Sequence, residues 1–172
     1  MSNAVYCIAS SRAQAETIVA GLKNAGFAAS EISVLMPDSK DSRDFAASED
    51  TAVPEGAATG AGAGVGLGAV LGWLAGIGLL AIPGAGPFIA AGPIMGALGG
   101  AVAGGATGGV IGALTNLGVH EDHARVYDDR IRSGGILVSV HTESAPQISA
   151  AKEIFHRAGA ENVNSTGVVV TV

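Results

Sequence analysis

The chain of 172 residues is 48% hydrophobic and only 14% charged, with a formal net charge of −6. Its basic residues are few and scattered, which excludes a nucleic-acid partner because phosphate binding needs clustered Lys and Arg. Most of the 27 glycines lie in residues 56–119, a stretch without Asp, Glu, Lys, Arg or His. This uneven distribution excludes an evenly mixed globular enzyme, and the apolar composition excludes simple disorder.

Residues 1–37 have the pattern strand, helix, strand. Apolar runs at residues 5–9 and 31–36 predict two short strands. Between them, four apolar residues at helical spacing predict a helix with one buried face: Ala15, Ile18, Val19 and Leu22. Ser11 and Gln14 form a candidate capping box before it, and Gly26 suits the left-handed position after its end.

Residues 120–172 repeat this plan after an additional amphipathic helix at residues 121–132. Residues 136–141 predict a strand, and residues 162–172 the last strand or two. A helix between them has an apolar stripe of Ile148, Ala151 and Phe155. At a constant offset, Ser144 matches Ser11, Gln147 matches Gln14 and Gly159 matches Gly26.

The two flanks therefore predict an α+β fold, a ferredoxin-like sheet with helices on one face. Residues 1–37 supply the first half, βαβ, and residues 120–172 the second half, αβαβ. Residues 38–55 are polar and acidic, typical of a solvated linker. The domain is thus expected to be split by the glycine-rich residues 56–119.

The glycines of this middle segment recur every four residues, in two runs. Such a period predicts helices whose backbones approach closely, and proline near residues 81–87 separates two arms at about residues 60–80 and 92–117. Pro93 is acceptable in the first turn of the second arm. The predicted helix-packing and oligomerisation residues are Gly60, Gly64, Gly68, Gly72, Gly76, Gly92, Gly96, Gly100, Gly104, Gly108 and Gly112.

Helical arms of these lengths would be roughly 31 and 39 Å long, enough for a bilayer core of about 30 Å. A four-residue step advances a glycine stripe about 40° around its helix, so the stripe is too broad for one partner helix. This predicts packing between copies of the chain, a homo-oligomer. The solvent around the hairpin, lipid or a protein-only interior, stays open at this point.

Candidate chemical sites are weak. Residues 76–81 match a GxGxxA nucleotide pattern but lie in an apolar run with no acidic residue following until Glu121. His120 and His123 have a spacing that a metal could use, but an acid-rich helix start explains their neighbours equally well. Capping explains Ser11, which has no partner base identifiable by spacing. We therefore predict no catalytic, cofactor-binding or metal residues.

Cys7 is the single cysteine and lies in an apolar run, as expected of a small buried hydrophobic residue in a reducing compartment. The first ten residues lack the basic start and long apolar core of a signal peptide. We expect a cytoplasmic protein, or one in the inner membrane with both termini on the cytoplasmic side.

Residues 124–140 include Tyr127, the pair Gly134 and Gly135, and then Leu-Val-Ser-Val at residues 137–140. This run resembles the "YxxxxxxGGxLVSV" segment of the bacterial general stress protein family of the YflT-like, low-temperature-induced type, whose members also carry a glycine-rich apolar middle. The resemblance implies a stress-associated protein without assigned catalytic residues.

The leading hypothesis is a non-enzymatic stress protein that self-associates through the glycine hairpin, at or in a membrane. The first alternative is a soluble self-assembling homo-oligomer, particle or filament with buried hairpins. The second is a sensor whose sheet domain binds a ligand or protein, which the fold allows but no residue supports.

Overall fold

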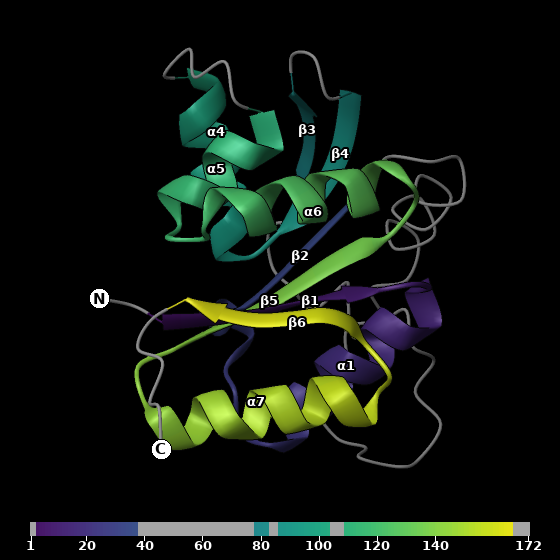
Figure 1. The fold of residues 1–172 in the computed structure, drawn as a ribbon, viewed down its shortest axis with the longest axis vertical. Coiled ribbons are helices and arrows are strands. Elements are labelled where there is room, and N and C mark those ends of the chain that lie inside the picture. The colour runs from purple at the N-terminus through teal and green to yellow at the C-terminus, as the bar shows by residue number, and fades with distance from the viewer. Residues whose placement is uncertain (1–2, 38–77, 83–85, 104–108, 167–172) are drawn as a thin grey trace, which may run out of the picture.

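A computed structural model describes residues 3–37, 78–82, 86–103 and 109–166 (Figure 1). These residues form an α+β fold, one antiparallel sheet with helices on both faces. The predicted acidic linker and the first predicted arm up to residue 77 lie outside the described residues.

The elements predicted in the two flanks are confirmed within the described residues, with most strand ends shifted by one or two residues. Residues 167–172, the end of the last predicted strand or two, lie outside the described residues. The predicted helix at residues 121–132 has the same bounds in the structure. The flanking elements are β1 (Asn3–Ala9), α1 (Arg12–Asn24), the 3₁₀ turn η1 (Ala29–Glu31), β2 (Ile32–Pro37), α6 (Glu121–Arg132), β5 (Ile136–Thr142), α7 (Ala145–Arg157) and β6 (Glu161–Thr166).

Serine N-caps start α1 and α7, as predicted. The hydroxyl of Ser11 accepts a hydrogen bond from the amide of Gln14 at 3.3 Å, and Ser144 and Gln147 repeat the same bond at the same distance. In a capping box, the Gln14 side chain would accept in return from the amide of Ser11. In the structure, the side-chain carbonyl of Gln14 accepts from the amide of Ser10 instead. Each serine therefore satisfies one amide of the first helical turn, and the second bond of α1 differs from that of the simple box.

Glycine ends both helices in the way that the sequence predicts. Gly26 has φ +91° and Gly159 has φ +73°, the left-handed conformation that favours glycine. The amide of Gly26 donates to the carbonyl of Lys23, and that of Phe27 donates to Leu22. These two bonds form a Schellman motif, which satisfies carbonyl groups at the end of α1.

The glycine-rich middle differs from the predicted helical hairpin. Its described elements are β3 (Gly78–Ile82), β4 (Gly86–Ala91), α4 (Pro93–Ala103) and α5 (Gly109–Asn116). The predicted first arm is therefore wrong at residues 78–80, which pair with β4. The predicted second arm is helical but is not one helix, because α4 and α5 are separate and pack against each other.

Two physical reasons account for this difference. Glycine costs about 1 kcal/mol relative to alanine in a helix, so a glycine-rich apolar run forms a long helix only weakly. Gly109 also has φ +51°, which is incompatible with a continuous right-handed helix into α5. The strand pair β3–β4 gains backbone pairing with β2 instead, from Val34 opposite Ala91 to Pro37 opposite Phe88.

The sheet order is β3-β4-β2-β5-β1-β6, and every neighbouring pair is antiparallel. The four strands of the two flanks lie together, because β2 and β1 of the first flank alternate with β5 and β6 of the second. The described middle strands extend this sheet beyond β2 (Figure 1). The described part of the middle therefore continues the domain rather than leaving it as two helices.

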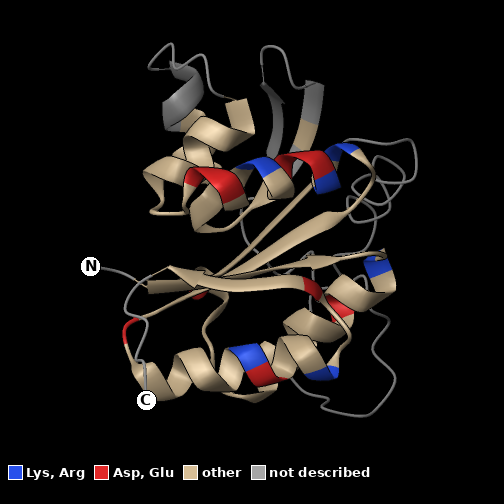
Figure 2. Cartoon of the chain, in the orientation of Figure 1, with Lys and Arg blue, Asp and Glu red and all other residues tan. Residues whose placement is uncertain are grey.

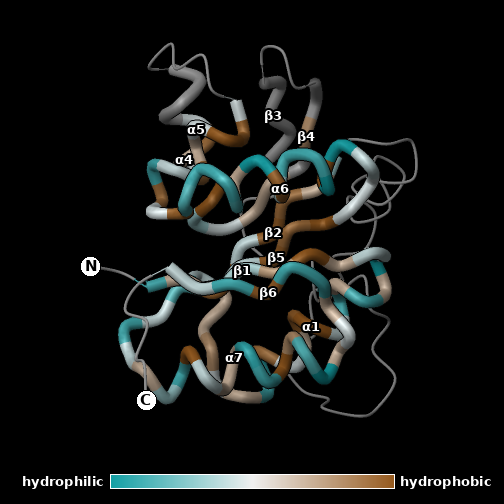
Figure 3. Tube along the Cα trace, viewed as in Figure 1, coloured by the Kyte–Doolittle hydropathy of each residue, from teal (hydrophilic) through white to brown (hydrophobic). Residues whose placement is uncertain are grey.

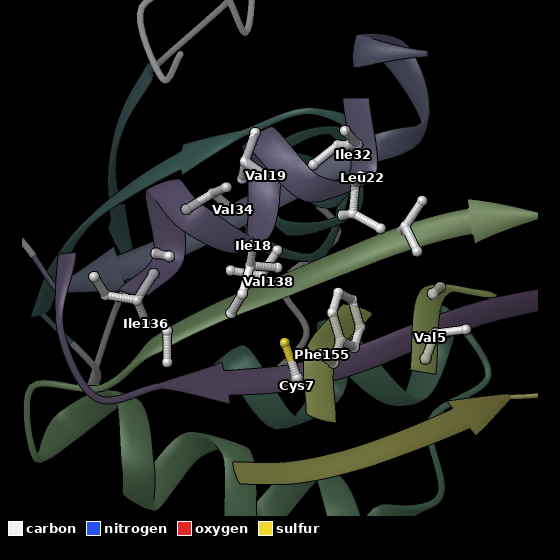
Figure 4. Close-up of a cluster of buried hydrophobic side chains, with 14 of the residues drawn as sticks. Val5, Cys7, Ile18, Val19, Leu22, Ile32, Val34, Ile136, Val138 and Phe155 are labelled. Carbon is white, nitrogen blue, oxygen red and sulfur yellow. The ribbon is translucent and has the colours of Figure 1, made fainter. Parts of the chain in front are cut away.

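One face of the sheet packs against α1 and α7. Alternate residues of the strands point into this layer, where Cys7, Val138 and Phe155 lie close together with Ile18 and Leu22 of α1 (Figure 4). The buried members are apolar, so this layer has the character of an ordinary hydrophobic core.

The other face is covered by α4, α5 and α6. Ile8, Leu35 and Leu137 point into this second layer and meet Ile94 of α4 and Leu114 of α5. The expectation of helices on one face is therefore wrong, and the physical reason is that both sheet faces carry clusters of apolar side chains. The brown stretches of the tube in Figure 3 mark the hydrophobic residues along the chain. The described part of the uncharged middle supplies α4 and α5 of this second layer, and the second flank supplies α6.

Charged side chains cluster on the helices of the two flanks, chiefly α6 and α7 (Figure 2). Several form pairs one helical turn apart, such as Arg132 with Asp128 and Arg157 with Glu153. The pair of Arg157 and Glu153 is exposed, where such pairs contribute little to stability. In the other pair Asp128 is buried, so this charge, unlike the exposed ones, does not mark a solvated helix face.

Candidate functional site

Only some of the predicted packing glycines lie in the part of the chain that the structure describes. Gly96 and Gly100 lie in α4, Gly112 lies in α5, and Gly92 immediately precedes α4. The others lie outside the described residues: Gly60, Gly64, Gly68, Gly72, Gly76, Gly104 and Gly108.

Gly92 has a role within the chain. Its φ is +79°, and an ideal Cβ on it would lie 2.1 Å from the carbonyl oxygen of Ile32 in β2. A glycine is therefore required where the chain turns from β4 into α4. The sequence interpretation of Gly92 as part of a helical stripe missed this turn.

Three glycines inside α4 and α5 have no close neighbour in the part of the chain that the structure describes. An ideal Cβ on Gly96, Gly99 or Gly112 would meet no atom of these residues within 4 Å, and Gly96 is exposed. Nothing in the described residues therefore requires glycine at these positions, although glycine weakens the helices that contain it. We call Gly96, Gly99 and Gly112 the open glycines.

A second feature is a row of hydroxyl groups inside the layer between the sheet and α4–α6. Ser139 of β5 lies directly opposite Tyr6 of β1 on one side and Ser33 of β2 on the other. Side chains of directly paired residues point to the same face, and Tyr6 belongs to the apolar cluster beneath α4–α6. We call Tyr6, Ser139 and Ser33 the hydroxyl row.

Ser33 joins the sheet to α4. Its hydroxyl oxygen accepts a hydrogen bond from the amide of Ile94, at 3.2 Å, in the first turn of α4. Both groups are buried, and the bond spans 61 residues of sequence. Ser33 thus acts as a cap for a helix that starts far away in the chain.

Four buried side-chain atoms of the described residues have no hydrogen-bond partner: Tyr6 Oη, Asp128 Oδ1, Ser139 Oγ and His141 Nδ1. By strand alternation His141 points to the same face as Ser139, and Asp128 is on the buried side of α6. All four therefore belong to the layer beneath α4–α6. Each buried polar group without a hydrogen-bond partner costs about 1–3 kcal/mol of stability. The presence of four such atoms in one layer therefore needs a physical explanation.

The two tyrosines of this layer are in contact. The ring centroids of Tyr6 and Tyr127 are 6.1 Å apart, and the Tyr127 hydroxyl donates to the carbonyl oxygen of Asn162 at 2.9 Å. Burial raises the pKa of Tyr6 to about 12, so its hydroxyl is neutral at physiological pH. A neutral Tyr6 hydroxyl is able both to donate and to accept a hydrogen bond, and it supplies no charge.

His141 is half-buried near the end of β5. Burial lowers its pKa below the usual 6.5, and a hydrogen bond with the backbone of Glu31 opposes this effect. The neutral imidazole is thus the form that the folded chain favours.

The histidines considered as metal ligands are held by other contacts. His120 Nδ1 lies 3.4 Å from Asp122 Oδ2, and His123 Nε2 lies 2.8 Å from the side-chain nitrogen of Asn164. Within the described ranges, no group of three His, Cys, Asp or Glu side chains is arranged to hold a metal ion.

Cys7 is fully buried in the α1–α7 layer, as the sequence suggests. Burial raises the pKa of its thiol far above the usual range. A buried neutral thiol is a poor nucleophile, so the geometry gives Cys7 a packing role.

The hydroxyl row was not predicted, although a signal for it exists. Ser33 and Ser139 each lie within an apolar run of a strand. Both sides of these strands are buried, so either orientation places the serine in the interior. A serine at such a position is a buried polar group that needs a partner. Only the pairing of β1, β2 and β5 shows that these residues lie side by side.

In the part of the chain that the structure describes, no helix combines the length and the apolar character needed to cross a membrane. Comparisons of the chain with protein-family models, curated proteins and solved structures give no match.

Proposed function

We propose that the chain is a non-enzymatic, stress-associated protein that self-associates through the open glycines of α4 and α5. The observation that carries this proposal is the free space at Gly96, Gly99 and Gly112. Glycine weakens a helix, and a close helix contact is the usual reason for its presence there. Since the described residues provide no such contact, we assign the contact to a second copy of the chain.

The composition of these helices supports the same proposal. Neither α4 nor α5 contains a charged side chain, whereas α6 and α7 carry charged pairs on their exposed sides. A neutral surface with small residues allows two identical faces to meet without charge repulsion or steric obstruction.

We further propose that the flanks form a ferredoxin-like domain. The order β2-β5-β1-β6 of the four flanking strands supports this, with a helix following β1 and another following β5. The glycine-rich middle is then an insertion between β2 and α6, and its described part covers the sheet face opposite α1 and α7.

Gly96→Leu and Gly112→Leu test the self-association proposal directly. Size-exclusion chromatography with light scattering, or native mass spectrometry, should show the intact chain as an oligomer and each variant as smaller species. Ser149→Leu adds the same side chain on the exposed side of α7 and should leave the assembly unchanged. Monomeric intact chain, or variants that assemble normally, would reject the proposal.

The membrane form of this proposal depends on residues 60–77, which lie outside the described residues. High-speed fractionation of cells distinguishes it from self-assembly in solution. Protein in the pellet that detergent releases supports a membrane site, and large particles in a detergent-free supernatant support the alternative. Both forms predict that Gly96→Leu weakens assembly.

A further inference from the structure

We propose that the layer between the sheet and α4–α6 binds internal water, in a hydrogen-bonded network that joins Ser139 to Tyr6 beside the N-terminus of α4. This inference is independent of self-association, because it concerns the interior of one copy.

The first step of the argument is the geometry of the row. Ser139 is paired with Tyr6 and Ser33 on its two sides, so the three side chains leave the sheet at neighbouring positions on one face. Side chains of directly opposed residues are about 4.5–5.5 Å apart at Cβ. The two serine hydroxyls lie close to the sheet, whereas the Tyr6 hydroxyl lies at the far end of a ring that reaches Tyr127 of α6. The three residues are therefore adjacent across three strands, and the proposed network between Ser139 and Tyr6 is a chain of water rather than one molecule.

The second step is the count of partners. Ser139 and Tyr6 are each 1% exposed, and neither hydroxyl has a protein partner. Ser33 is fully buried, and its oxygen already accepts from Ile94 at the start of α4. The start of α4 is thus bonded to the direct neighbour of the unpartnered Ser139, and Ser139 is in turn paired with the unpartnered Tyr6. Buried polar groups without a partner favour a bound hydrogen-bonding molecule.

The third step is the chemistry of the occupant. The hydroxyl row holds no charged group, and burial keeps the Tyr6 hydroxyl neutral, which disfavours an anion or a cation. Hydroxyls both donate and accept, and water does the same. The surrounding side chains are large and apolar, among them Ile94, Leu137 and Ile8, which favours a molecule of the smallest size.

The sign of a stability change tests this network, because the two interpretations predict opposite results. Without a partner, a buried hydroxyl is a cost, and Ser139→Ala or Tyr6→Phe would stabilise the chain. In a water network each substitution removes a hydrogen bond, so the equilibrium constant of unfolding should rise about threefold to tenfold. Urea unfolding of the full chain at one protein concentration measures this constant.

The double variant supplies the second measurement. If one network joins the two hydroxyls, then Ser139→Ala together with Tyr6→Phe should raise the constant by less than the product of the single effects. Ser149→Ala removes an exposed hydroxyl that donates to Ala145 and should change little. Single variants that are unchanged or stabilised, or effects that simply multiply, would overturn the proposal.

A high-resolution crystal structure of the intact chain provides a direct check. Ordered water within hydrogen-bond distance of Ser139 Oγ and Tyr6 Oη is the expected result. Hydroxyls that bond directly to protein groups would overturn the proposal.

Discussion

Gly92 and Ile32 are so close that the turn before α4 has no room for a side chain. An ideal Cβ on Gly92 would lie 2.1 Å from the Ile32 carbonyl oxygen and 2.9 Å from Ser33 Cα. The same glycine also has a left-handed φ of +79°. One residue thus sets both the direction of α4 and its contact with β2, which places Ser33 at the first turn of the helix.

Gly92→Ala is expected to destabilise the chain by about 2–4 kcal/mol, because the new methyl group meets backbone and because φ is unfavourable for alanine. Gly96→Ala is the matched control, since its Cβ would meet no atom and the helix gains about 0.5–1 kcal/mol. Urea unfolding at low protein concentration measures both. Equal effects of the two substitutions would show that the turn is not the constraint.

Ser33→Ala should cost about 1–2 kcal/mol, because the buried amide of Ile94 loses its acceptor. Amide hydrogen exchange gives a more specific readout than global stability. Exchange in the first turn of α4 should accelerate more than exchange in α7, whose own cap is Ser144. A uniform acceleration across both helices would argue against a local capping role.

These two positions also show why the flanks were predictable and the middle was not. The caps Ser11 and Ser144 bond to residues three positions later, so the sequence itself contains both partners. Ser33 caps Ile94 from a distant strand, which no local pattern reveals. A capping residue can be read from sequence only when its partner is close along the chain.

The same argument applies to the glycine-rich middle. A four-residue period of glycine predicts a helix because helical neighbours are four residues apart, and α4 and α5 confirm that part. The strands β3 and β4 form because they pair with each other and with β2, a long-range contact that outweighs local preference. The hydroxyl row could not be predicted from the sequence either. Its three residues lie on β1, β2 and β5, which become neighbours only in the folded sheet.

The stability of the chain should contain a pH-dependent contribution from His141. Burial lowers its folded pKa below 6.5, so the unfolded chain binds a proton first as the pH falls. The stabilising contribution is therefore present above about pH 6.5 and is lost as the pH falls toward the folded pKa. One proton allows a slope of at most about 1.4 kcal/mol per pH unit.

His141→Gln removes this titration and keeps a polar side chain. The difference in unfolding free energy, intact chain minus variant, should decrease between about pH 7.5 and pH 5. His156→Gln, on the exposed side of α7, is the control and should leave the profile of the intact chain unchanged. A difference that stays constant with pH would contradict a buried His141.

Gln14 connects the start of α1 to the end of α7. Its side-chain nitrogen donates to the carbonyl of Ala158 at 2.9 Å, while its side-chain oxygen accepts from the amide of Ser10 at 2.7 Å. The same side-chain oxygen accepts from the Ser10 hydroxyl at 3.0 Å. Gln14→Ala is expected to cost about 1–2 kcal/mol, because these three hydrogen bonds, all at least partly exposed, are lost. Gln14→Glu keeps the acceptor and loses the donor. The loss of unfolding free energy in this variant, compared with the loss in Gln14→Ala, therefore measures how much of the stabilisation comes from the bond to Ala158.

Cys7 offers a direct measure of opening in the α1–α7 layer, because it is the single cysteine of the chain. Its thiol is fully buried, and burial raises its pKa, so both access and thiolate formation are suppressed in the folded state. We expect a thiol reagent at pH 8 to modify the native chain far more slowly than the urea-unfolded chain. Gly92→Ala should accelerate the reaction in proportion to its effect on global stability, whereas Gly96→Ala should slow it. Rapid modification of the native chain would show that this layer opens locally, which its continuous apolar packing argues against.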